Sequence, residues 1–88
     1  IRDSLTRCLA VAMAPEVAVN CIAPGLVENT RMAQRLPDNV AAGARRQAVL
    51  GLVGQADDIA EQTLAFVCSR SVSGQTIVID GGMPGAMR

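Results

Sequence analysis

The residues with the clearest chemical potential follow a short apolar run and begin at Pro24. Pro24-Gly25 would let the chain turn sharply off the edge of a sheet, and Gly25 has no Cβ, so a flat ring could approach its backbone closely. Strand ends in open α/β sheets are where ligands bind. The pattern predicts a binding site from Pro24 to Thr30, and strand termination alone is the alternative explanation of the Pro-Gly pair.

A second glycine-containing stretch, Asp80-Gly81-Gly82, superficially resembles a loop that binds phosphate. Such loops use the amide groups at the start of a following helix, and we expect no such helix here, because Gly82 lies six residues from the end of the sequence and Pro84 follows it. We interpret this stretch as a terminal turn.

Groups that could transfer a proton are few in this chain. The 88 residues include no Tyr, Lys or His, so the candidates for general acid and base are eight Asp and Glu and three Cys. We therefore predict no catalytic residue, and we expect the chain to be inactive as an enzyme on its own.

The three cysteines cannot all pair with one another, and their spacing matches no zinc pattern, so no metal site is predicted. Cys8 falls on an apolar helical face, Cys21 in a strand and Cys68 near a helix end. We interpret all three as small buried hydrophobic residues in a reducing compartment, which favours a cytoplasmic location.

Composition and charge argue against two classes of partner. Eight Arg balance eight Asp and Glu, and no basic stripe alternates with aromatic residues, so no nucleic-acid partner is expected. A solvated helix face explains Arg45-Arg46 more simply than an anion site does. No apolar run reaches the roughly 18 residues needed to span a bilayer, so no membrane partner is expected.

Hydrophobic periodicity and turn residues predict the order helix-strand-helix-helix-strand. The predicted helices cover residues 1–14, 38–47 and 57–68, and the predicted strands cover residues 17–22 and 76–79. A long crossover that contains helix implies that the two strands are parallel. The sequence therefore predicts an α/β fold.

The same patterns predict which side chains are buried. The first strand is apolar on both alternations, which is typical of a strand covered on both faces, and Asn20 is interpreted as a partner for backbone groups. Asp38 is expected to cap the second helix. The inner face of that helix is expected to be Val40, Ala41, Ala44 and Ala48. The apolar stripe of the last helix is expected to be Ile59, Ala60, Thr63, Leu64 and Val67.

Two separated stretches, residues 20–27 (NCIAPGLV) and 74–82 (GQTIVIDGG), carry a family resemblance. Together with residues 5–15 and 57–69, they resemble the C-terminal third of the short-chain dehydrogenase/reductase family. The resemblance implies the C-terminal portion of a Rossmann-type doubly wound parallel sheet. Residues 1–88 would form the C-terminal segment of a single NAD(P)-binding domain, with the N-terminal part missing from this sequence.

The resemblance also implies a cofactor and a reaction. Family members bind NAD or NADP and interconvert an alcohol and a carbonyl in a small-molecule substrate. The main chain of Val27 would contact the nicotinamide carboxamide, and a nearby Thr hydroxyl would reach the carboxamide or the pyrophosphate. The usual spacing puts Asn29 at that position, whereas the hydroxyl here belongs to Thr30. The expected cofactor-binding residues are Pro24, Gly25, Leu26, Val27, Asn29 and Thr30. The family's catalytic Tyr and Lys would lie upstream of Ile1.

A second kind of function stays open at this point. The chain could be a non-catalytic, dehydrogenase-like module for oligomerisation or interaction, because unpaired strand edges and uncovered apolar helix faces attract partners. The family commonly forms dimers and tetramers, so the resemblance implies a homo-oligomer under either reading.

Overall fold

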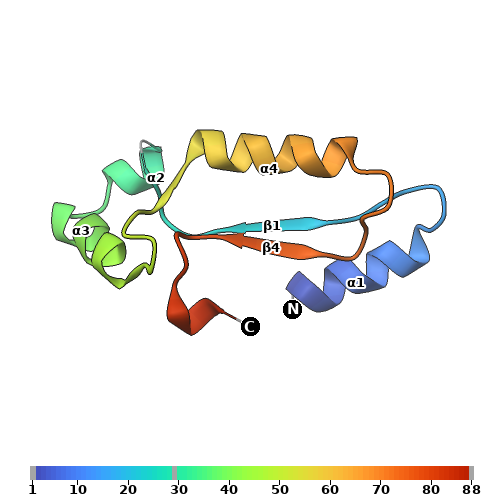
Figure 1. The fold of residues 1–88 in the computed structure, drawn as a ribbon, viewed down its shortest axis with the longest axis horizontal. Helices are drawn as coiled ribbons and strands as arrows, with labels where there is room; N and C mark the ends of the chain where they lie inside the picture. The colour runs from blue at the N-terminus through green and yellow to red at the C-terminus, as the bar shows by residue number, and fades with distance from the viewer. Residues whose placement is uncertain (1, 29, 88) are drawn as a thin grey trace.

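The computed structural model describes residues 2–28 and 30–87 (Figure 1). Asn29, one of the predicted site residues, lies outside the described residues. In chain order the elements are α1 (Arg2–Ala12), β1 (Cys21–Pro24), β2 (Val27–Glu28), α2 (Arg31–Gln34), α3 (Asp38–Gln47), β3 (Gly54–Gln55), α4 (Ala56–Cys68), β4 (Thr76–Ile79) and the 3₁₀ turn η1 (Pro84–Ala86).

β1 and β4 form a two-stranded parallel sheet around which the other elements are arranged. Cys21 pairs with Thr76 and Pro24 pairs with Ile79, so both strands end at the same edge. α4 and α1 lie on opposite sides of this sheet, and α2 and α3 lie beyond the carboxyl ends of its strands (Figure 1). Parallel strands flanked by helices on both faces confirm the predicted α/β class.

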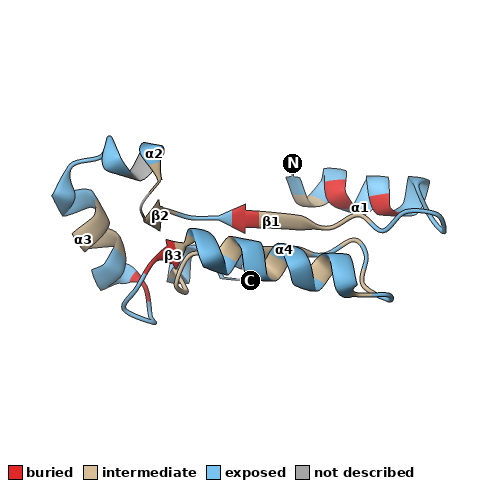
Figure 2. Cartoon of the chain, turned by 90° about the horizontal axis from the view of Figure 1, so that it is seen from above, coloured by how far each residue is buried: buried red, intermediate tan, exposed pale blue. Residues whose placement is uncertain are grey.

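A second parallel pair was not predicted from the sequence. β2 pairs with β3, with Val27 opposite Gly54 and Glu28 opposite Gln55. Figure 2 shows this pair beyond the tip of β1. Strands of two residues are too short to produce a detectable alternation of apolar and polar residues.

The predicted start of the first strand is wrong. β1 begins at Cys21, and Val17, which was expected to be buried, is 43% exposed. The preceding residues are held by a loop instead of a regular ladder, since the Val19 N–H donates to Ser73 Oγ at 3.1 Å and the Gly74 N–H donates to Val19 O at 2.7 Å. These irregular contacts delay regular pairing until Cys21.

The Asn20 side chain acts as the sequence predicted. Its Nδ2 donates to Val72 O at 3.1 Å, and its Oδ1 accepts from the Gln75 N–H at 3.1 Å. The amide thereby satisfies two backbone groups at the entrance to the sheet. This confirms Asn20 as a structural partner of the backbone.

The predicted burial of the cysteines is wrong. Cys8 and Cys68 are exposed, and Cys21 is half-buried. α1 buries only Thr6 and Ala10, and it ends at Ala12 instead of at residue 14. Because the helix touches the sheet along a narrow line of small side chains, Cys8 stays on the solvent side.

The bounds predicted for α3 are confirmed, whereas its cap and part of its inner face are not. Pro37 stands at the N-cap position, and no side chain forms a cap bond there. Ala48 is buried and Ala41 and Ala44 are half-buried, but Val40 is 43% exposed. Because Pro37 occupies the N-cap position, Asp38 lies in the first turn, where its charge interacts favourably with the helix dipole.

The apolar stripe predicted for α4 is correct only at Ile59. The half-buried side of the helix includes Ile59, Gln62 and Phe66, while the other predicted stripe residues are exposed. Those exposed residues are Ala60, Thr63, Leu64 and Val67. A two-stranded sheet is too narrow to cover every apolar residue of a thirteen-residue helix.

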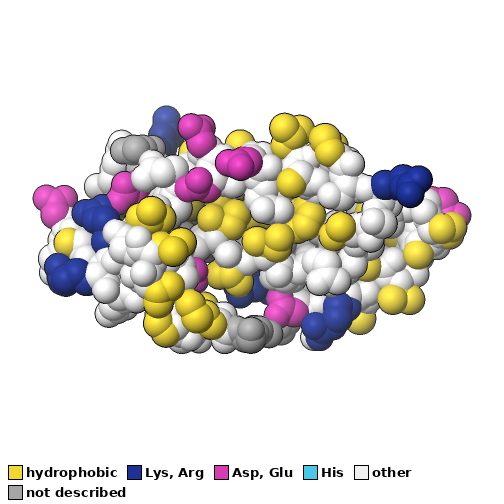
Figure 3. Space-filling model, in the orientation of Figure 1, with side chains coloured by type: hydrophobic (Ala, Val, Ile, Leu, Met, Phe, Trp, Pro, Cys, Tyr) yellow, Lys and Arg dark blue, Asp and Glu magenta, His cyan; other side chains and the backbone are white. Residues whose placement is uncertain are grey.

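The buried core is small, as the few red segments in Figure 2 show. Its hydrophobic members among the described residues are Ala10, Ala23, Ala48 and Val53. Larger apolar side chains stay accessible, and hydrophobic atoms form a band along the middle of the face in Figure 3. In the part of the chain that the structure describes, no helix has the length and apolar character needed to cross a bilayer.

Candidate functional site

The Pro-Gly corner lies where β1 and β4 end. The Gly25 N–H donates to Ile79 O at 2.9 Å, which continues the sheet by one bond beyond Pro24. A Cβ on Gly25 would lie 2.7 Å from Asp80 Cβ and 3.3 Å from Asp80 Cα. The missing side chain at position 25 is therefore explained by close packing of the two strand ends, a reason that the sequence did not reveal.

The next predicted site residues continue along the same edge. Pro24 and Gly25 are exposed, and Leu26 and Val27 are half-buried. The Thr30 hydroxyl donates to Val27 O at 2.8 Å. The structure thus brings together Val27 and Thr30, which the sequence had assigned to one ligand.

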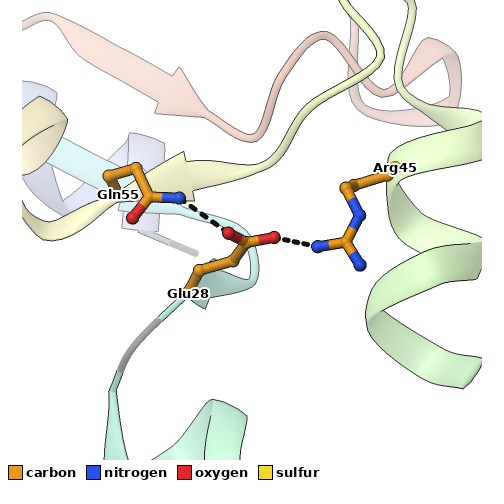
Figure 4. A network of polar contacts seen from close by, with 3 residues as sticks. All are labelled: Glu28, Arg45 and Gln55. Carbon is orange, nitrogen blue, oxygen red and sulfur yellow. Dashed lines mark hydrogen bonds and ion pairs between the residues drawn. The ribbon is translucent and has the colours of Figure 1, made fainter. Parts of the chain in front are cut away.

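Glu28 joins three elements at this edge and was not predicted as a functional residue. Its Oε2 accepts from Gln55 Nε2 at 2.8 Å, and its Oε1 forms an ion pair with Arg45 Nη1 of α3 (Figure 4). Arg45 is thus engaged with a carboxylate, which corrects its interpretation as part of a merely solvated face. Sequence spacing gives no sign of this contact because 17 residues separate the two side chains.

Asp80 organises a turn where the sequence predicted one, although the short 3₁₀ turn η1, which was not expected, follows from Pro84. Its Oδ1 accepts from the N–H groups of Gly82 at 2.9 Å and Met83 at 3.1 Å. Gly81 has a φ of +76°, and a Cβ there would lie 1.8 Å from Leu52 O. Only glycine fits such a conformation so close to another segment.

Residues 31–50, which we call the covering segment, are attached to that turn. The Val49 N–H donates to Gly82 O at 2.9 Å, and the Leu50 N–H donates to Gly81 O at 3.0 Å. The covering segment is thus tied to the terminal turn at one end, while Arg45 reaches Glu28 from within it. It lies beyond the strand ends, where ligands bind in open α/β sheets (Figure 1).

The site offers groups that can form hydrogen bonds with a ligand. Its residues supply backbone amides, carbonyls, a hydroxyl and a paired carboxylate. Within the described residues, no group of three or more potential metal ligands comes together. These groups can hold and orient a ligand through hydrogen bonds.

Known proteins resemble this chain over most of its length. Residues 2–84 match a family model described as enoyl-(acyl carrier protein) reductase. Tropinone reductase-like 3 from Erythroxylum coca is 40% identical over 85 residues, which cover 91% of this chain and 32% of that protein. Short-chain dehydrogenase/reductase SDRA from Arabidopsis thaliana is 37% identical over 84 residues, covering 91% and 33% respectively. The chain belongs to the short-chain dehydrogenase/reductase family.

A solved structure of a small-chain dehydrogenase in complex with NADPH agrees with this assignment. It superposes with a TM-score of 0.77 at 30% sequence identity, over 93% of this chain and 38% of that one. The Rossmann-type fold class predicted from the sequence is thereby confirmed. The chain spans about a third of the length of the curated family members that it matches.

Proposed function

We propose that residues 1–88 form the C-terminal segment of a single NAD(P)-binding domain in an oxidoreductase that interconverts an alcohol and a carbonyl. In this proposal the segment supplies the wall of the site on the nicotinamide side. The residues assigned to that wall are Pro24, Gly25, Leu26, Val27, Asn29 and Thr30. The covering segment would lie over a small-molecule substrate.

One observation carries the proposal. The Thr30 hydroxyl donates a hydrogen bond to the Val27 carbonyl at the shared carboxyl edge of β1 and β4. Open α/β sheets bind their ligands at this edge. Exposed Pro24 and Gly25 stand beside them, so a planar ring could lie against the backbone there. The wall would orient the ring, and any proton transfer would depend on groups outside this chain.

The choice of coenzyme class follows from the family members. They are named reductases and dehydrogenases, and one was solved with NADPH. We assign NAD or NADP to the site on this ground. The three cysteines of this chain are free thiols, which fits a reducing cytoplasm.

The second candidate function is a non-catalytic module for oligomerisation or interaction. The observation that favours it is the number of large apolar side chains left accessible, such as Leu5, Leu64 and Val67 at 57%, 61% and 76% exposure. A homo-oligomer that covers these side chains is compatible with either function.

A pair of threonine variants tests the proposed coenzyme site. Thr30→Val removes the hydroxyl at the site, and Thr63→Val removes an equivalent hydroxyl that donates to Ile59 O at 2.8 Å in α4. In the full-length polypeptide, we expect Thr30→Val to weaken NADH or NADPH binding about three- to tenfold, and Thr63→Val to leave it unchanged. Fluorescence titration of the reduced coenzyme measures both.

The titration also separates the two candidate functions. No binding of either reduced coenzyme by the unmodified, folded polypeptide would favour the interaction module. Binding that responds equally to both substitutions would contradict the placement of the site at Thr30.

A further inference from the structure

We propose that Glu28 is a positioning residue whose carboxylate latches the covering segment, residues 31–50, onto the end of the sheet. The latch itself is a claim about contacts within this chain. Its effect on substrate binding rests on the proposed function, because only there does the covering segment lie over a substrate.

The latch is built from both oxygens of one carboxylate. Glu28 Oε1 pairs with Arg45 Nη1 of α3, and Glu28 Oε2 accepts from Gln55 Nε2 at the start of α4 (Figure 4). Gln55 is itself fixed, because it forms a reciprocal capping box with Asp58 in the first turn of α4. Glu28 thus connects α3 to a side chain that is held by a helix terminus.

α3 depends on this contact because packing holds it weakly. None of its residues is buried. The Glu28 and Arg45 side chains are 26% and 44% exposed, so the ion pair is accessible to water and salt. A contact of this strength can break and re-form without unfolding the sheet, which suits a segment that must admit a substrate and then close.

The latch also acts directly beside the proposed coenzyme contacts. Glu28 follows Val27 in β2, and Val27 O is the acceptor of the Thr30 hydroxyl. Engagement of the Glu28 side chain by Arg45 and Gln55 restrains the strand that Glu28 shares with Val27. Closing the covering segment and ordering the coenzyme wall are thus coupled through one residue.

Local proteolysis tests the latch without any assay of activity. Thermolysin cleaves before Leu and Val, and the covering segment offers exposed Val40 and Val49. In the full-length polypeptide we expect Glu28→Gln and Arg45→Gln each to speed cleavage within residues 31–50 about two- to fivefold. Cleavage of the double variant should be no faster than cleavage of either single variant, because both substitutions remove the same contact.

Matched controls carry the same chemical changes outside the network. Glu16→Gln alters an exposed carboxylate in the turn after α1, and Arg46→Gln alters the neighbour of Arg45. Thermolysin should cleave both control variants at the same rate as the unmodified protein. Equal rates in all four single variants, or additive effects in the double variant, would overturn the proposal.

Salt provides a second measurement that needs no substitution. Raising the ionic strength from 0.05 M to 0.5 M screens an exposed pair, so cleavage in the covering segment of the unmodified protein should accelerate. Cleavage in α1 and α4 serves as the internal reference. A cleavage rate in the covering segment that does not change with salt would contradict the latch, even if a Glu28 variant failed to fold.

Kinetics connect the latch to the proposed function. We expect Glu28→Gln to raise the KM for the carbonyl substrate about two- to fivefold. A protein with the proteolysis effects but without coenzyme-dependent turnover would keep the latch and reject the proposed function. A protein that turns over substrate but lacks the proteolysis effects would support the proposed function and reject the latch.

Discussion

At the residue scale, Gly25 and Asp80 lie close together at the ends of the two central strands. A Cβ on Gly25 would come within 2.7 Å of Asp80 Cβ, closer than such atoms approach in proteins. The Asp80 carboxylate in turn holds the N–H groups of Gly82 and Met83. A methyl group at position 25 would therefore push against the residue that organises the terminal turn.

We predict that Gly25→Ala lowers the free energy of unfolding of the full-length polypeptide by about 1–3 kcal/mol, because overpacking must displace Asp80. Gly43→Ala is the matched control. Its new Cβ would meet only Arg46 Nη2 at 3.8 Å, and alanine in a helix interior should stabilise by about 0.5–1 kcal/mol. Urea denaturation measures both. Similar effects of the two substitutions would show that the strand ends do not pack as described.

Single residues were predictable when their partners are close in sequence or belong to the backbone. Asn20 was correctly assigned to backbone partners, because an amide at the end of an apolar run has few other uses. The Glu28–Arg45 pair was missed, because its partners come from a two-residue strand and a distant helix. Cys8 and Cys68 were misplaced because apolar character alone does not say which face a neighbouring element will cover.

At the element scale, α4 begins with a capping box that explains why the helix starts at Ala56. The Gln55 N–H donates to Asp58 Oδ2 at 2.8 Å, and the Gln55 side chain accepts from the backbone of Asp58. Asp57 also lies in the first turn, where its charge interacts favourably with the helix dipole. Two adjacent carboxylates thus share the electrostatic setting, but only Asp58 makes the capping bond.

Comparing these neighbours isolates the capping bond. We predict that Asp58→Ala lowers the free energy of unfolding by about 0.5–2 kcal/mol more than Asp57→Ala does, because both lose the dipole interaction and one also loses the cap. Urea denaturation of the two variants gives the difference directly. Equal losses would mean that the capping box does not contribute to stability.

Element boundaries were predictable where the sequence contains residues that typically start or end a helix. The range of α3 was correct because Asp38 marked its first turn and Gly51 follows its end. The start of β1 was wrong because regular pairing depends on β4, and residues 19 and 20 are bound by the loop before β4. The apolar stripe predicted for α4 was wrong at most positions. Periodicity identifies the apolar residues that a sheet could bury, whereas the width of the sheet determines how many of them are buried.

At the scale of the whole molecule, the 88 residues are more extended than a compact domain of this size. The radius of gyration is 14.8 Å, against about 12 Å expected for a compact chain of this length. The accessible surface is 6406 Å², against about 4,900 Å² expected from the mass. The excess of roughly 1,500 Å² on this one chain is nearly twice the roughly 800 Å² that each partner buries in a standard protein interface.

Exposed apolar side chains of α1 form part of this surface. Leu5, Leu9 and Val11 are 57%, 41% and 79% exposed. Apolar surface of this extent is normally covered by another part of a domain or by another chain. Among the described residues, the sheet of β1 and β4 has only two strands, so its outer edges are unpaired and favour association with further strands.

We therefore predict that the 88-residue chain, expressed alone, is weakly stable and self-associates. Its midpoint of thermal unfolding should rise with protein concentration, since association of folded chains stabilises them by mass action. Replacing Leu5 and Leu9 by Gln should weaken association, whereas replacing the exposed polar residues Ser4 and Arg7 of the same helix by Gln should not. Sedimentation velocity combined with thermal melts at several concentrations measures this. A sharp melt at one temperature for a strict monomer would contradict it, because it would require the small core around Ala10, Ala23, Ala48 and Val53 to stabilise the fold alone.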